Sequence, residues 1–104
     1  MQFKQKAPFT FNKSVWGPLK QIVAEYFVDD YMYMGSVVLE TVGEVHQYKH
    51  VSTRRSFLIS DDGECYRWSA SQGGHWYEII PKSIAFDIVF EPSLVNPFNQ
   101  KGGK

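Results

Sequence analysis

Aromatic side chains and one imidazole gather between residues 66 and 77. They are Tyr66, Trp68, His75, Trp76 and Tyr77. Aromatic rings with a few polar groups form the usual lining of small-molecule pockets, and ring faces also attract organic cations. We therefore expect these residues to bind a small apolar or aromatic ligand. The alternative is that the rings belong to the core or to a subunit interface, because Trp76 and Tyr77 leave a strand in opposite directions.

His46 and His50 are four residues apart, a spacing with different consequences in a helix and in a strand. In a helix it would bring both rings to one face, where they could share a metal ion. In a strand, the rise per residue separates them by about 13 Å. Since the surrounding residues favour a strand, we expect ordinary strand histidines, with no metal and no cofactor.

Catalytic chemistry has little support in the sequence. The G-x-S-x-G pattern of a nucleophile elbow is missing, and Gly73-Gly74 lacks the lysine and hydroxyl residue of a phosphate-binding loop. On a strand, His75 and Glu78 would point to opposite faces. We therefore expect no catalytic residues. An enzyme of unknown reaction that uses His50 or His75 is the third and least favoured interpretation.

Cys65 is the single cysteine of the chain, so an internal disulfide is excluded. A lone thiol suits a reducing compartment, and we expect a cytoplasmic protein. We also expect this thiol to lie in a strand without a chemical role, because catalytic use would need a nearby base that lowers its pKa.

Charge is balanced overall but uneven along the chain. Eleven lysines and arginines match eleven acids, so no bulk charge attracts nucleic acid or an anionic membrane. Lys49, Arg54 and Arg55 lie close together beside Tyr48, whereas acids dominate residues 25–44. Such a split suits self-association or a charged protein partner better than nucleic acid. No apolar run approaches the roughly 20 residues of a membrane span, and no membrane is expected.

The length of 104 residues fits one domain, and 43% hydrophobic residues can build its core. We place that domain at residues 1–98 and a flexible tail at residues 99–104. Apolar residues at i, i+3, i+4, i+7 and i+8 predict one helix, with Pro18 in its first turn and Asp29 at its end. They are Leu19, Ile22, Val23, Tyr26 and Phe27.

The chain after this helix predicts strands. Asp62-Gly63 predicts a two-residue turn with positive φ at Gly63, which would pair Ile59 with Tyr66. The same register would bring Phe57 opposite Trp68.

A second hairpin is expected to turn at Gly43-Glu44, with Leu39 opposite Tyr48. Two further strands are expected at residues 76–80, before a proline, and at residues 84–90, where apolar side chains alternate.

These elements predict an α+β fold, in which one N-terminal helix packs on a curled antiparallel sheet of about five to six strands. A helix-filled partial barrel is the alternative. Free sheet edges and surplus rings favour a non-enzymatic binding or interaction domain that forms a homodimer through Trp76 or Tyr77. Its small size is typical of a bacterial, phage or mobile-element accessory protein. The runner-up is a small-molecule binding protein with an aromatic pocket between helix and sheet. A competing explanation for the surplus rings is that residues 1–13 or 92–98 fold back over the second face.

Overall fold

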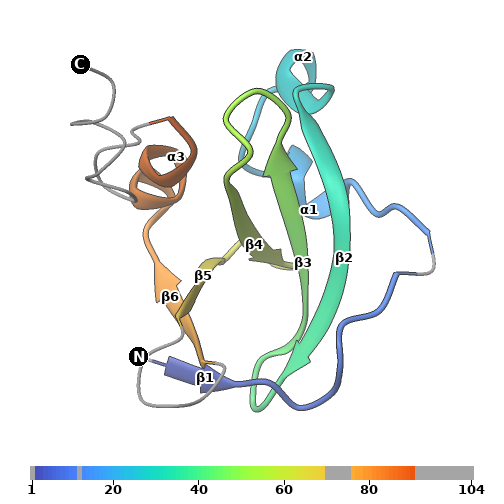
Figure 1. Ribbon diagram of the computed structural model, residues 1–104, viewed down its shortest axis with the longest axis vertical. Coiled ribbons are helices and arrows are strands. Elements are labelled where there is room, and N and C mark those ends of the chain that lie inside the picture. Colours follow the sequence, from blue (N-terminus) through green and yellow to red (C-terminus); the bar gives the residue numbers. More distant parts are fainter. Residues whose placement is uncertain (1, 12, 70–75, 91–104) are drawn as a thin grey trace.

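The computed structural model describes residues 2–11, 13–69 and 76–90 (Figure 1). Within these ranges, six strands form one antiparallel sheet accompanied by three short helices. The elements are β1 Gln2–Lys4, α1 Gly17–Lys20, α2 Glu25–Val28, β2 Tyr31–Leu39, β3 Gly43–His50, β4 Ser56–Ser60, β5 Cys65–Ser69, β6 Trp76–Ile80 and α3 Lys82–Phe90. The strands lie in the order β1-β6-β5-β4-β3-β2. A curled antiparallel sheet accompanied by helices is therefore confirmed, and the sheet makes up the larger part of the described fold.

The N-terminal segment bonds to both edges of the sheet. β1 pairs with β6 and places Phe3 opposite Tyr77. Farther along, Thr10 and Ser36 of β2 exchange backbone hydrogen bonds of 2.8 and 2.9 Å. The sheet thus curls into a half-barrel, and the segment from Phe3 to Thr10 runs from β6 to β2 (Figure 1).

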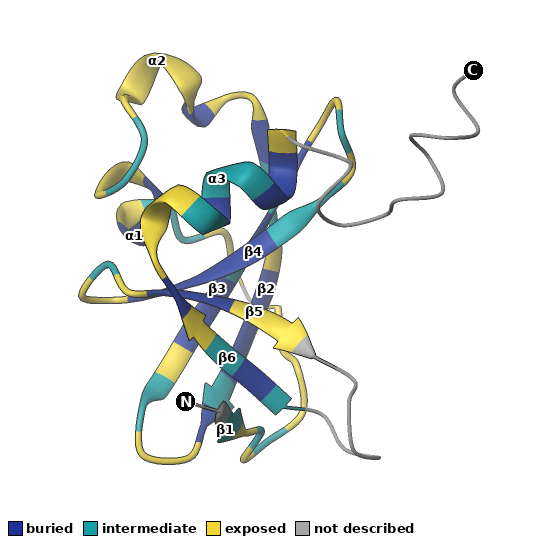
Figure 2. Ribbon diagram, turned by 90° about the vertical axis from the view of Figure 1, so that its left-hand side faces the viewer, coloured by how far each residue is buried: buried dark blue, intermediate teal, exposed yellow. Residues whose placement is uncertain are grey.

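Both faces of the sheet carry buried side chains, whereas the end of β5 is exposed (Figure 2). One face lies beneath the helices, and we call its apolar residues the helix-side cluster; they are Leu19, Val28, Tyr31, Tyr48, Phe57, Ile59, Cys65, Ile80, Ala85, Ile88 and Val89. The other apolar group, which we call the strand-side cluster, consists of Val37, Leu39, Val45, Leu58, Tyr66 and Tyr77. The neighbours Phe57 and Leu58 belong to different clusters, because successive side chains of a strand point to opposite faces.

One continuous helix from Pro18 to Asp29 was expected, and this expectation is wrong. The chain instead forms α1 and α2, which are separated by a turn. Ile22 and Val23 in this turn are β-branched, and such side chains lose rotamer freedom in a helix. The break leaves Tyr26 on α2 84% exposed, whereas the continuous helix would have turned it toward the sheet.

The turn between α1 and α2 is hydrogen-bonded to the loop between β4 and β5. The Gln21 side-chain amide donates a hydrogen bond of 2.6 Å to the backbone carbonyl of Asp61, in the β4–β5 loop. This contact joins residues 40 positions apart. It is a tertiary contact of the turn that helix periodicity does not encode.

The strand expected at residues 84–90 is also wrong, because this segment belongs to α3. Alternation favoured a strand, but Ala85, Ile88 and Val89 stand at i, i+3 and i+4, and the helix buries all three. The Ala85 N–H donates to the Pro81 carbonyl at 3.1 Å and closes the first turn. α3 packs on β4 and β5, so a C-terminal helix covers this part of the sheet.

The β4–β5 hairpin is confirmed, but its register differs by one residue from the expected one. Tyr66 lies opposite Leu58 instead of Ile59. The Gly63 N–H donates to the Ser60 carbonyl at 3.0 Å, and Gly63 has a φ of 89°, so three residues form the loop. The positive φ at Gly63 is therefore confirmed. Since both faces are apolar and buried, the hydrophobic pattern could not select the register.

The β2–β3 hairpin turns earlier than expected. Leu39 lies opposite Gly43 instead of Tyr48, so the turn comprises residues 40–42. Thr41 in this turn adopts a φ of 64°, a left-handed conformation that its residue type does not announce. The strand expected at residues 76–80 is confirmed as β6.

A bulge in β2 shifts its pairing with β3 between Tyr33 and Gly35. Gly35 has a φ of 115°, and a Cβ atom there would lie 2.7 Å from the carbonyl oxygen of Thr10. Glycine is therefore required where the N-terminal segment runs antiparallel beside β2.

Candidate functional site

Two of the five residues expected to bind a ligand, Tyr66 and Tyr77, are buried in the strand-side cluster. Tyr66 and Tyr77 are 4% and 3% exposed. Phe3 packs edge-on against Tyr66 with ring centres 5.8 Å apart. The Tyr77 hydroxyl donates to Oε1 of Gln5 at 3.0 Å. The N-terminal segment therefore covers these two rings within a single chain.

The two tryptophans of that group lie nearer the solvent. Trp68 is half exposed, and Trp76 is half-buried with the Lys4 amine 5.7 Å from its ring centre. His75 lies outside the described residues. Binding by these five residues remains a prediction, and the hollow described next is formed by other side chains.

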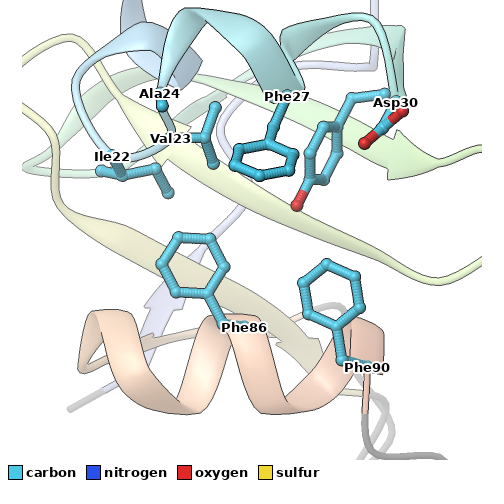
Figure 3. A pocket seen from close by; sticks show the side chains of 8 residues that line it. Ile22, Val23, Ala24, Phe27, Asp30, Phe86 and Phe90 are labelled. Carbon is cyan, nitrogen blue, oxygen red and sulfur yellow. The ribbon is translucent and has the colours of Figure 1, made fainter.

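A hollow of about 280 Å³ opens between α2 and α3. Its lining consists of Ile22, Val23, Ala24, Phe27, Asp30, Tyr31, Phe86 and Phe90. Figure 3 shows Phe27 extending from α2 toward α3, while Phe86 and Phe90 extend from α3 toward α2. Phe27 and Phe90 are 49% and 50% exposed, so the hollow is open to solvent and almost wholly apolar.

Local structure positions the aromatic rings of the hollow. Phe86 and Phe90 are four residues apart on α3, which places both on one face of the helix. Phe86 also meets Phe57 of the helix-side cluster edge-on, with ring centres 6.2 Å apart. Phe90 meets His50 in the same way at 4.9 Å. Contacts with the core therefore fix the rings from α3 while their other sides line the hollow.

Asp30 supplies the one charged side chain in this lining. Burial, and then the negative charge of Asp30, raise the pKa of Tyr31 to about 12. The backbone carbonyl of Asp30 accepts a hydrogen bond of 2.8 Å from the Val51 N–H, which fixes the position of this residue. The hollow thus combines apolar walls with a carboxylate at its rim.

His50 does not line the hollow, but it contacts rings that do. Its Nδ1 atom accepts hydrogen bonds from the backbone N–H groups of Ser52 and Thr53 at 3.2 and 3.3 Å. The imidazole ring also meets Tyr31 edge-on, with ring centres 5.1 Å apart. His50 therefore links the β3–β4 turn to the ring that lines the hollow.

A hydrogen-bonded series joins Tyr33, His46 and Asp61. The Tyr33 hydroxyl lies 2.9 Å from Nδ1 of His46, and Nε2 of His46 lies 3.2 Å from Oδ1 of Asp61. Such a series resembles acid–base machinery in residue types, but His46 is 3% exposed and neither Tyr33 nor His46 lines the hollow. Burial raises the pKa of Tyr33, which disfavours a phenolate. The series therefore ties β2 and β3 to the β4–β5 loop.

Other chemical groups also have structural positions. Cys65 is 1% exposed, and burial raises the pKa of its thiol to about 11, which disfavours the reactive thiolate. His46 and His50 both lie on β3, as the sequence predicted. Across the described ranges, no three histidine, cysteine or acidic side chains converge as metal ligands. Within the same ranges, none of the helices has the length and apolarity to cross a membrane.

Sequence reasoning missed the residues that line the hollow. Phe27 was assigned to the core face of a continuous helix, and Phe86 and Phe90 to one face of a strand. The available signal was the helical spacing of Ala85, Ile88 and Val89, which favours a helix and would have placed Phe86 and Phe90 on one helix face.

Comparisons of the chain with known protein families, curated proteins and solved structures found no match.

Proposed function

We propose that this protein binds a small, mostly apolar molecule in the hollow between α2 and α3. The observation that carries the proposal is the convergence of Phe27, Phe86 and Phe90 on a space of about 280 Å³ (Figure 3). Ligand sites commonly have volumes of roughly 300–1,000 Å³, so the expected ligand is at the small end of that range.

The energetic argument concerns the apolar surface that the hollow leaves in water. Phe27 and Phe90 each remain about half exposed although they face the same space. Covering apolar surface contributes about 25 cal/mol per Å², and exposed apolar patches commonly mark binding sites. A small ligand that contacts both rings would recover this free energy without a rearrangement of the sheet.

Isothermal titration calorimetry with indole and with cyclohexanol tests the proposal. We expect binding with a negative heat-capacity change, the mark of apolar burial. The variant Phe27→Ala should weaken binding about tenfold, equivalent to about 1.4 kcal/mol. Glu25→Ala is the matched control, because Glu25 lies on the same helix and does not line the hollow, whereas Tyr26 packs against Phe27.

Two results would contradict the proposed function. One is the lack of any binding heat with either probe. The other is an equal loss of affinity in the Phe27 and Glu25 variants, which would show that the loss does not come from the hollow.

Self-association or docking of a protein partner is a second candidate function, and the exposure of Tyr26 favours it. This ring is 84% exposed and meets Phe27 edge-on at 5.1 Å, which gives α2 an aromatic surface. Such a surface is a more accessible interface than Tyr77, which is buried within the chain. Sedimentation velocity at micromolar concentration should detect a dimer that Tyr26→Ser weakens, and a monomer at all concentrations would exclude the homodimer.

A further inference from the structure

The hollow between α2 and α3 carries a specific electrostatic pattern. Phe27 faces it from α2, and Phe86 and Phe90 face it from α3 (Figure 3). The face of an aromatic ring carries partial negative charge, which attracts a cation within about 6 Å of the ring centre. Three rings from two opposing helices therefore surround the space that one occupant would fill, and a cation lying over the face of any of them would be attracted.

Asp30 adds a full negative charge at the rim of the same hollow. Within the described part of the chain, its side chain has neither a hydrogen bond nor an ion pair. No lysine, arginine or histidine belongs to the lining. The negative charge at this rim is thus not neutralised by the lining, and a positively charged occupant would complement it.

We propose that the ligand of the hollow is a small organic cation whose charge is carried by an alkylated ammonium group. This inference rests on the proposed function and specifies its ligand. A primary ammonium has three N–H donors to satisfy, and the side-chain acceptors of the lining are confined to the Tyr31 hydroxyl and the Asp30 carboxylate, while its other side chains are apolar. An alkylated ammonium needs few or no acceptors, and its methyl groups pack against the apolar walls.

Calorimetry with choline and with 3,3-dimethylbutan-1-ol separates charge from shape. The two molecules have the same size and outline, but only choline is charged. We expect choline to bind about tenfold more tightly, because ring faces and Asp30 act on its charge alone. The difference should shrink as salt is added, since Asp30 is exposed and salt screens such pairs.

Asp30→Asn and Asp29→Asn form a matched pair of variants. Asp29 is the neighbouring exposed acid and does not line the hollow. We expect Asp30→Asn to weaken choline severalfold and to leave the neutral alcohol unchanged, while Asp29→Asn changes neither. Circular dichroism of both variants should show unchanged melting, since the Asp30 contacts described above use its backbone.

The outcomes distinguish the two proposals. Equal affinity for choline and the alcohol, or an equal effect of both substitutions, would overturn the cation inference and leave the apolar site in place. Binding of neither molecule, together with binding of indole, would do the same. If indole, cyclohexanol, choline and the alcohol all failed to bind, the proposed function itself would be wrong.

Discussion

The two faces of the curled sheet are closed in different ways. On the strand side, the N-terminal segment pairs with both sheet edges, and Phe3 seals the cluster against Tyr66. On the helix side, three short helices cover the sheet, and Phe27 and Phe90 remain half exposed around a hollow. Extended backbone covers Tyr66 and Tyr77 on one face, where Trp68 stays half exposed, whereas helices of four, four and nine residues leave a hollow between α2 and α3 on the other.

The two clusters also differ in what their cover presents to solvent. The strand-side cluster buries both of its tyrosines and satisfies the Tyr77 hydroxyl through Gln5. The helix-side cluster holds the larger core, yet its cover presents apolar rings and one carboxylate to solvent. The hollow on the helix side is therefore the place where we propose that a ligand binds.

The largest expected effect comes from neighbouring residues on opposite faces. Phe57→Ala should lower the free energy of unfolding by about 3–5 kcal/mol, and Leu58→Ala by about 2–5 kcal/mol. These residues are 0% and 3% exposed. Guanidinium unfolding monitored by circular dichroism measures both. A loss below about 1 kcal/mol for Leu58→Ala would show that the strand-side cluster is not a second core.

Alkaline titration probes the helix side through Tyr31. Its pKa rises from 10.0 to about 12 through burial first and the charge of Asp30 second. Between these values the unfolded chain releases a proton that the folded chain retains, so the free energy of unfolding falls as pH rises through this window. The expected loss from this group is on the order of 2 kcal/mol. Unfolding of the wild-type chain and of Tyr31→Phe between pH values of about 9 and 12 should differ accordingly, and identical losses would refute the assignment.

A smaller loss of stability is expected from a substitution where the N-terminal segment runs beside β2. Gly35→Ala should destabilise by about 1–2 kcal/mol, because its positive φ and its contact with the Thr10 carbonyl both oppose a Cβ atom. Gly63→Ala is the control: it shares the positive φ, but its Cβ would meet the flexible end of Gln21. Thermal melts of both variants give the comparison. A smaller loss of stability for Gly35→Ala than for Gly63→Ala would argue against the close approach of the Thr10 carbonyl to Gly35.

Local signals in the sequence predicted the curled antiparallel sheet, the β4–β5 hairpin and the strand at residues 76–80. Turn chemistry at Gly63 and the apolar strands carried this information. Registers were not predictable, because the β4–β5 loop holds one more residue than expected and both faces accept apolar side chains. The left-handed Thr41 in the β2–β3 turn likewise has no signature in its residue type.

The candidate site was harder to predict than the fold. Its rings come from α2 and α3, whereas the sequence predicts one longer helix in place of α2 and a strand in place of α3. The contact between Gln21 and the Asp61 carbonyl, which holds the turn between α1 and α2, joins distant parts of the chain. No local pattern encodes such a contact. Tyr66 and Tyr77, two of the residues that the sequence predicts to bind a ligand, are instead covered by the N-terminal segment.

Methyl-resolved NMR during a titration with indole tests most directly whether the hollow is a binding site. Ile22 and Val23 line the hollow, whereas Val37 and Val45 lie in the strand-side cluster. We predict saturable chemical-shift changes at the methyl groups of Ile22 and Val23, with those of Val37 and Val45 unchanged. Unchanged methyl groups in Ile22 and Val23, or equal changes in both clusters, would contradict the account.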